Sequence, residues 1–209
     1  MRKRPLPYDG AAARAHVMKA DPVMRGIIKR VGDYALEVRG EPYEALLRSI
    51  LYQQLAGAAA AAIERRFLAL FDDRIPQPDE LAAISDNDLR TAGLSRQKSS
   101  YLRSIAEHFA SGEMSNRVLR RADDDTVIEL VTRIKGVGRW TADMLLLFCL
   151  GRPDVLPVGD LGVRNSMQAA YSLDDPPDTE TMMRIGESWR PYRSVGTWYL
   201  WRRGDIVTL

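Results

Sequence analysis

Apolar residues recur along this chain with the three- and four-residue spacing of α-helices. Val127, Leu130, Val131 and Ile134 form one such stripe, and this spacing places all four on one face of a helix. The chain lacks a sustained alternation of apolar and polar residues, which is the pattern of a strand with one buried face. The pattern therefore predicts an all-α protein.

Start and stop signals bound several of the predicted helices. Pro42 suits the first turn of a helix, and Ser85 suits the cap of a short helix that ends before Gly93. Thr126, with Glu129 three residues later, fits a capping box. Further helices are predicted over residues 96–110, 139–150, 160–171, 179–187 and 193–202.

Clusters of glycine, proline and acidic residues interrupt the helical pattern on both sides of a central segment. They lie near residues 32–40 and 151–159. We therefore expect a central helical lobe over residues 40–150 and a second helical lobe formed by residues 1–39 together with 151–209. The total of 209 residues is sufficient for one core or two small lobes, and too short for several independent domains.

Composition excludes several kinds of chemistry. With 30 Lys and Arg against 28 Asp and Glu, the formal net charge is +2, which allows a basic face only if acidic residues balance it elsewhere. A single cysteine excludes an intrachain disulfide and a cysteine-bound iron–sulfur cluster, and two histidines disfavour a histidine-built metal site or triad. No secretory signal or membrane-spanning run is recognisable, so we expect a protein of the cytoplasm or nucleoid with no membrane partner.

Basic residues are concentrated in two segments. Residues 90–121 contain seven basic side chains against two acidic ones, and residues 184–203 contain five against one. A solvated helix face explains either segment alone. Together they favour, modestly, a polyanionic partner such as nucleic acid.

Two glycines one residue apart join two of the predicted helices. Residues 134–142 read Ile-Lys-Gly-Val-Gly-Arg-Trp-Thr-Ala. Glycine at positions 136 and 138 permits positive φ and leaves backbone amides open beside a helix N-terminus, which suits one phosphate. A plain turn between helices is the alternative for an isolated Gly-x-Gly. A nucleotide-binding strand–helix motif fits less well, because no strand precedes the glycines.

Five blocks in order resemble the helix-hairpin-helix (HhH-GPD) superfamily of DNA glycosylases. Residues 130–142 are similar to its hairpin, and residues 156–164 are similar to the segment that holds its catalytic aspartate, which places that residue at Asp160, 22 residues after Gly138. Three further blocks resemble the alkylpurine branch, the 3-methyladenine DNA glycosylase II (AlkA-like) enzymes. These blocks are residues 50–55, 93–98 and 189–194, the last followed by Trp198 and Trp201.

The resemblance implies a two-lobed helical fold with its active site in the cleft between the lobes. It also implies a monomeric, compact enzyme, without the N-terminal β-domain of longer members, that flips an alkylated purine such as 3-methyladenine or 7-methylguanine out of double-stranded DNA and hydrolyses its N-glycosidic bond. Lyase activity is not expected, because Trp140 stands where bifunctional members have a lysine nucleophile. The alternatives are a related glycosylase for a deaminated or oxidised base and a non-catalytic DNA-binding module.

The resemblance assigns the chemistry to Asp160 and to aromatic rings. Asp160 would stabilise an oxocarbenium-like sugar, although it also suits the N-cap of the helix that follows. Trp140 and Tyr192, with Trp189 behind them, would favour a cationic base through their electron-rich rings. A core position is the alternative for each aromatic residue, and it is the expectation for Trp198 or Trp201.

The resemblance further implies a DNA-contacting surface. Gln54 matches the intercalating position, whereas Leu55 is the more natural apolar wedge unless it packs in a buried turn between helices. No cofactor is expected to be required, but the hairpin would hold Na⁺ or K⁺ through the carbonyls of Thr132, Ile134 and Val137. The residues expected to contact DNA are Gln53, Gln54, Leu55, Arg96, Lys98, Gly136, Val137, Gly138, Arg139 and Arg164.

Overall fold

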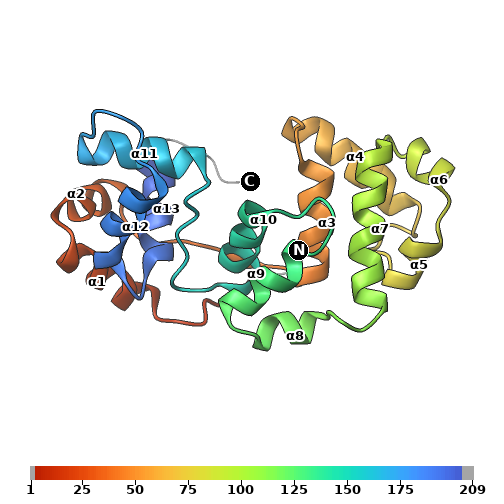
Figure 1. The fold of residues 1–209 in the computed structure, drawn as a ribbon, viewed down its shortest axis with the longest axis horizontal. Helices are drawn as coiled ribbons and strands as arrows, with labels where there is room; N and C mark the ends of the chain where they lie inside the picture. The colour runs from red at the N-terminus through yellow and green to blue at the C-terminus, as the bar shows by residue number, and fades with distance from the viewer. Residues whose placement is uncertain (1–2, 204–209) are drawn as a thin grey trace. The chain divides into compact units, whose positions relative to one another are not determined.

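Helices form almost all of the regular structure of this protein (Figure 1). The computed structural model describes residues 3–203, and within them lie thirteen α-helices, one π-helical segment and one 3₁₀ turn, which confirms the all-α prediction. No helix in this range is long and apolar enough to cross a membrane. Strand β1 (Lys3–Arg4) pairs antiparallel with β2 (Val38–Arg39). A strand of two residues is too short to produce a recognisable alternation of apolar and polar residues, so the sequence did not predict these strands.

The chain packs as two compact units. Unit 1 is continuous and comprises Gly40–Leu145, whereas unit 2 combines residues 3–39 with residues 146–203. Unit 1 therefore ends at Leu145 and not at the boundary expected from the sequence, residue 150. The chain passes from one unit to the other inside the π-helical segment η1 (Leu145–Leu150), where no glycine or proline marks the change.

Unit 1 contains α3 (Pro42–Tyr52), α4 (Gly57–Ala69), α5 (Pro78–Ala83), α6 (Asp86–Thr91), α7 (Arg96–Ala110), α8 (Asn116–Arg121), α9 (Asp124–Thr132) and α10 (Arg139–Met144). Its central helix is α7, which packs against α3, α5 and α6 through a face that includes Leu102 and Ile105. Helix α3 also packs against α4 and α8, and α9 packs against α10. The segment between α9 and α10 is the glycine hairpin.

Unit 2 contains α1 (Gly10–Ala20), α2 (Pro22–Val31), α11 (Leu161–Tyr171), α12 (Thr179–Gly186), the 3₁₀ turn η2 (Glu187–Trp189) and α13 (Arg193–Arg203). Helix α13 is at its centre, in contact with α1, α2, α11 and η2 (Figure 1). Every residue of α13 from 194 to 201 is buried. A helix buried on all sides lacks an amphipathic pattern, and it can hold neighbouring segments on several faces at once.

The predicted helix starts are confirmed at Pro42 and Ser85 and wrong at Thr126. Pro42 is the first residue of α3, and the Ser85 hydroxyl accepts a hydrogen bond from a backbone amide in the first turn of α6 at 3.1 Å. Helix α9 begins before Thr126, because the Asp123 carboxylate accepts the hydrogen bond from the Thr126 amide at 2.8 Å. Three aspartates precede Thr126, and each is as good a cap as threonine.

Candidate functional site

The two glycines of the hairpin differ in conformation. Gly136 has a φ of +86°, and a Cβ built there would lie 2.2 Å from the ring of Tyr101, so both the backbone and the packing require glycine. Gly138 has a φ of −100° and is the N-cap of α10. Gly138 therefore does not adopt the positive φ that glycine permits. Apart from the adjacent residues of the chain, no heavy atom lies within 4 Å of a Cβ built on Gly138, which leaves room for a ligand backbone beside the start of α10.

Side chains from elsewhere in unit 1 hold the hairpin in place. Gln53, in the turn after α3, donates a hydrogen bond through Nε2 to the carbonyl oxygen of Gly136 at 3.1 Å. The Ser104 hydroxyl, on α7, accepts a hydrogen bond from the Lys135 amide at 3.2 Å. The turn after α3 and the glycine hairpin are more than 80 residues apart in the sequence, and the structure places them in direct contact.

The hairpin carbonyls expected to hold Na⁺ or K⁺ come from the end of α9 and the turn that follows. Carbonyl oxygens are the kind of ligand that hard cations take, so this donor set fits a monovalent cation. The Ile134 carbonyl also accepts a hydrogen bond from the Val137 amide at 3.0 Å, and the Thr132 hydroxyl donates back to the Ile128 carbonyl at 2.7 Å. Binding of a cation by Thr132, Ile134 and Val137 stays a prediction.

The turn of residues 53–56 exposes the two wedge candidates. Gln54 has a φ of +57°, a conformation that is uncommon for residues other than glycine. Gln54 is exposed, and Leu55 is 38% exposed, so the alternative of a buried turn is wrong for Leu55. An exposed apolar tip held in a strained turn is consistent with a side chain that inserts between bases.

The basic residues near this turn differ in what they contact. Arg96 is exposed at the start of α7. Lys98 is half-buried, and its Nζ donates a hydrogen bond to the Leu51 carbonyl at 2.8 Å, while burial lowers its pKa. Lys98 therefore supports the last turn of α3, directly before the exposed turn, in addition to any contact with DNA.

Two further arginines expected to contact DNA have partners within the protein. Arg139 donates through Nε to the buried Asp143 carboxylate at 3.0 Å, one helical turn along α10. Burial raises the pKa of Asp143, and the hydrogen bond from Arg139 partly opposes that shift. Arg164, on α11, donates through Nε to the Pro177 carbonyl at 2.7 Å. Arg164 thus fastens the loop before α12, a structural contact that the sequence did not indicate.

The candidate base-binding aromatics are unequally accessible. Trp140, on α10 of unit 1, is 48% exposed. Tyr192, in unit 2, is half-buried, and the ring of His16 packs edge-on against it with 5.4 Å between ring centroids. Trp189 is fully buried. Its ring therefore supports the core of unit 2 and does not present a face to a ligand.

Asp160 is the N-cap of α11 and is held in one orientation by two donors. Its Oδ1 accepts a hydrogen bond from the Val163 amide at 2.8 Å and another from Trp201 Nε1 at 3.0 Å. The capping role considered for Asp160 is therefore confirmed. The cap leaves the carboxylate half-buried at the positive end of the α11 dipole, so capping and catalysis are compatible.

Trp201 is a site residue that the sequence did not indicate, because a core position was expected for it or for Trp198. It is 3% exposed, and its indole stacks on Phe148 with 5.5 Å between ring centroids and an interplanar angle of 24°. The indole N–H nevertheless donates to Asp160, 41 residues earlier. A buried tryptophan needs a partner for its N–H, but nothing in the local pattern says which acceptor it finds.

Comparisons with known proteins show the family to which this chain belongs. Residues 47–191 match the family model described as HhH-GPD superfamily base excision DNA repair protein. The chain is 36% identical over 201 residues to DNA-3-methyladenine glycosylase 1 of Schizosaccharomyces pombe, an alignment that covers 93% of this chain and 88% of that protein.

Two solved structures are similar in both sequence and fold. A 3-methyladenine DNA glycosylase of Schizosaccharomyces pombe in complex with abasic DNA is 35% identical with a TM-score of 0.80, over 91% of this chain and 95% of that one. A DNA-3-methyladenine glycosidase from Bacillus halodurans is 35% identical with a TM-score of 0.85, over 98% and 93% of the two chains. The family match, the identities and the shared fold together show that this chain belongs to the HhH-GPD superfamily of base excision DNA repair proteins.

Proposed function

We propose that this protein is a base excision repair glycosylase that hydrolyses the N-glycosidic bond of alkylated purines in double-stranded DNA. The observation that carries the proposal is the Asp160 carboxylate, which the α11 amide and the Trp201 indole hold in one orientation. The names of the relatives, which specify 3-methyladenine, support the substrate class. We expect the enzyme to act as a monomer, without lyase activity, in the cytoplasm or nucleoid.

The chemistry asked of Asp160 is electrostatic. An alkylated purine such as 7-methylguanine carries a positive charge, so it departs as a neutral base and a dedicated general acid is not required. Departure leaves positive charge on the sugar, and a fixed carboxylate stabilises that charge. The same carboxylate can orient the attacking water and accept its proton.

The exposed features of unit 1 fit the DNA-binding part of the reaction. Extruding a nucleotide costs a few kcal/mol of unstacking and unpairing. The exposed turn with Gln54 and Leu55 would fill the space that the base leaves. The start of α10 at Gly138 would bind one phosphate next to the lesion. We infer that these contacts offset the cost of flipping before the chemical step.

A base-release assay on methylated double-stranded DNA tests the proposed function. We expect the wild-type protein to release 7-methylguanine and 3-methyladenine, identified by chromatography, and to leave the strand intact until alkali is added. Strand cleavage without alkali would contradict the absence of lyase activity. On parallel duplexes that contain hypoxanthine or 8-oxoguanine, release of only these bases would favour a glycosylase for deaminated or oxidised bases. Binding to abasic-site DNA without any release would favour the non-catalytic module.

Replacement of Trp140 by alanine should reduce discrimination between alkylated and normal purines. A cation–π contact contributes about 0.5–2 kcal/mol, which corresponds to roughly a 2- to 30-fold change in the ratio of 7-methylguanine to guanine release. The ratio is measured by competition on one DNA substrate. Trp140→Phe keeps an aromatic face and should recover part of the selectivity. An unchanged ratio in Trp140→Ala would remove this residue from the base-binding surface.

A further inference from the structure

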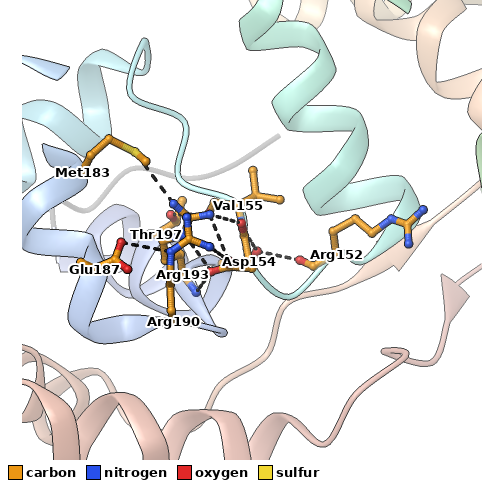
Figure 2. Close-up of polar contacts among 9 residues, drawn as sticks. Arg152, Asp154, Val155, Met183, Glu187, Arg190, Arg193 and Thr197 are labelled. Atoms are coloured by element: carbon orange, nitrogen blue, oxygen red, sulfur yellow. Dashed lines mark hydrogen bonds and ion pairs between the residues drawn. The ribbon is translucent and has the colours of Figure 1, made fainter. Parts of the chain in front are cut away.

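The loop that leads to Asp160 is fastened at its start by two arginines, Arg190 just before α13 and Arg193 at its first residue. The Asp154 carboxylate lies between two guanidinium groups, as Figure 2 shows: Oδ1 accepts a hydrogen bond from Arg193 Nε and Oδ2 accepts one from Arg190 Nη1, both at 2.7 Å. Arg190 also pairs with Glu187 at 3.1 Å. Asp154 is thus the point at which Arg190 and Arg193 hold the loop.

Arg193 holds both the side chain and the main chain of Asp154. Its Nη2 donates to the Asp154 carbonyl and to Oδ2, each at 3.0 Å, and its backbone amide donates to Oδ1 at 3.2 Å. The Arg193 side chain is 11% exposed and the Asp154 side chain 21%. A shielded pair with several charge-assisted hydrogen bonds is far more geometrically restrictive than an exposed ion pair.

Two hydroxyl groups of α13 extend this attachment along the loop. The Ser194 hydroxyl donates to the Arg152 carbonyl at 2.6 Å and accepts a hydrogen bond from the Val155 amide at 2.9 Å. The Thr197 hydroxyl donates to the Val155 carbonyl at 3.1 Å. Ser194 and Thr197 are both fully buried. The backbone of residues 152–155 is therefore hydrogen-bonded to one helix in place of a strand partner (Figure 2).

The same helix also holds the other end of the loop. Trp201, two turns further along α13, donates to the Asp160 carboxylate. Between the two attachments, the side chains of Val155 and Leu156 are buried, and the Asp160 amide closes a turn by donating to the Pro157 carbonyl at 2.9 Å. A single rigid helix thus sets the distance between the start of the loop and its functional carboxylate.

We propose that Asp154 and Arg193 are positioning residues that hold Asp160 where positive charge develops on the sugar. The inference rests on the proposed function of Asp160. Catalytic groups must be held within about 0.5 Å of the productive geometry, and a misplacement of about 1 Å costs on the order of 100-fold in rate. Loosening the Asp154–Arg193 pair should therefore slow base release without weakening the binding of DNA.

A direct contact between Arg193 and a DNA phosphate is the competing interpretation, since the segment around it is basic. The structure disfavours it, because Nε and Nη2 of Arg193 are directed at Asp154 and Nη1 lies 3.9 Å from the sulfur of Met183. The two interpretations predict different outcomes. A positioning residue affects the rate of the chemical step, and a phosphate contact affects DNA affinity and its salt dependence.

The test measures single-turnover release of 7-methylguanine, the Kd for abasic-site DNA and the Tm of each variant. Arg193→Met should lower the release rate by about 10- to 100-fold and leave the Kd within about threefold. Arg193→Lys keeps the charge but cannot bond the carboxylate and the carbonyl together, so its rate should be intermediate. Glu187→Gln is the matched control, because it removes an exposed partner of Arg190 and leaves the Asp154–Arg193 pair intact; its rate should match the wild type.

Two results would overturn the proposal. One is an unchanged release rate in folded Arg193→Met, and the other is a Kd that weakens as much as the rate falls. If Arg193→Met is unfolded at the assay temperature, the release rate and the Kd of Asp154→Asn and Arg193→Lys test the proposal by the same two criteria. A separate result tests the proposed function. If Asp160→Asn releases base at the wild-type rate, the proposed role of Asp160 is wrong, independently of the results for the Arg193 variants.

Discussion

The Asp160→Asn variant is expected to lose base release by about 10³-fold while keeping its fold. Asparagine retains an oxygen that can accept the hydrogen bonds from Val163 and Trp201, but it lacks the negative charge. Two opposite charges about 4 Å apart, at an effective dielectric constant of about 20, attract by about 4 kcal/mol. That energy corresponds to about 10³ in rate. Single-turnover release of 7-methylguanine measures the loss.

Asp178→Asn is the matched control for this prediction. Asp178 also caps a helix of unit 2, through a hydrogen bond from the Thr181 amide at 2.8 Å, but it is exposed. Its substitution should change neither release nor abasic-site binding. A release rate within a few-fold of the wild type in Asp160→Asn, with binding retained, would show that the carboxylate does not stabilise the transition state.

Asp21→Ala is expected to lower the free energy of unfolding more than any other single helix-cap substitution in this chain. Asp21 is buried between α1 and α2, and its Oδ1 accepts hydrogen bonds from the amides of Val23 and Met24 at 2.8 and 3.1 Å. Its Oδ2 accepts hydrogen bonds from Trp189 Nε1, at 2.8 Å, and from the Tyr171 hydroxyl. Burial and this carboxylate raise the pKa of Tyr171, so the hydroxyl stays protonated and donates.

Alanine at position 21 would leave the Trp189 and Tyr171 donors buried without their acceptor. Loss of a cap costs about 1 kcal/mol and each unsatisfied buried donor about 1–3 kcal/mol, so we expect a loss of about 3–5 kcal/mol. For a protein of this size, that is a fall in Tm on the order of 10 °C, measured by thermal unfolding.

Asp9→Ala isolates the capping contribution. Asp9 caps α1 in the same way, since its Oδ1 accepts hydrogen bonds from the amides of Ala11 and Ala12 at 2.9 and 3.1 Å, but Asp9 is exposed. It should cost only about 1 kcal/mol. Equal losses in Asp9→Ala and Asp21→Ala would mean that the hydrogen bonds from Trp189 and Tyr171 add no net stability.

Local sequence predicted the helices on which the site is built. Helix α7 spans Arg96–Ala110 and α13 spans Arg193–Arg203, within one residue of the expected ranges. The prediction for α7 succeeded because the spacing of apolar residues and the cap are properties of neighbouring residues. The same reasoning failed at Thr126, where the preceding Asp123 is an equally good cap. It predicted no bounds for α1 and α2, whose junction is the buried Asp21.

The sequence alone was thus enough to predict the helical fold class, to show the family resemblance and to identify Asp160 as the candidate catalytic residue. Packing settled what each side chain contacts. Trp201 reaches Asp160 across 41 residues, Lys98 reaches the Leu51 carbonyl across 47, and Arg193 reaches Asp154 across 39. Contacts over such separations depend on how whole helices pack against one another, and hydrophobic periodicity carries no information about that arrangement. For this reason the carboxylate was visible in the sequence, whereas the residues that orient it were not.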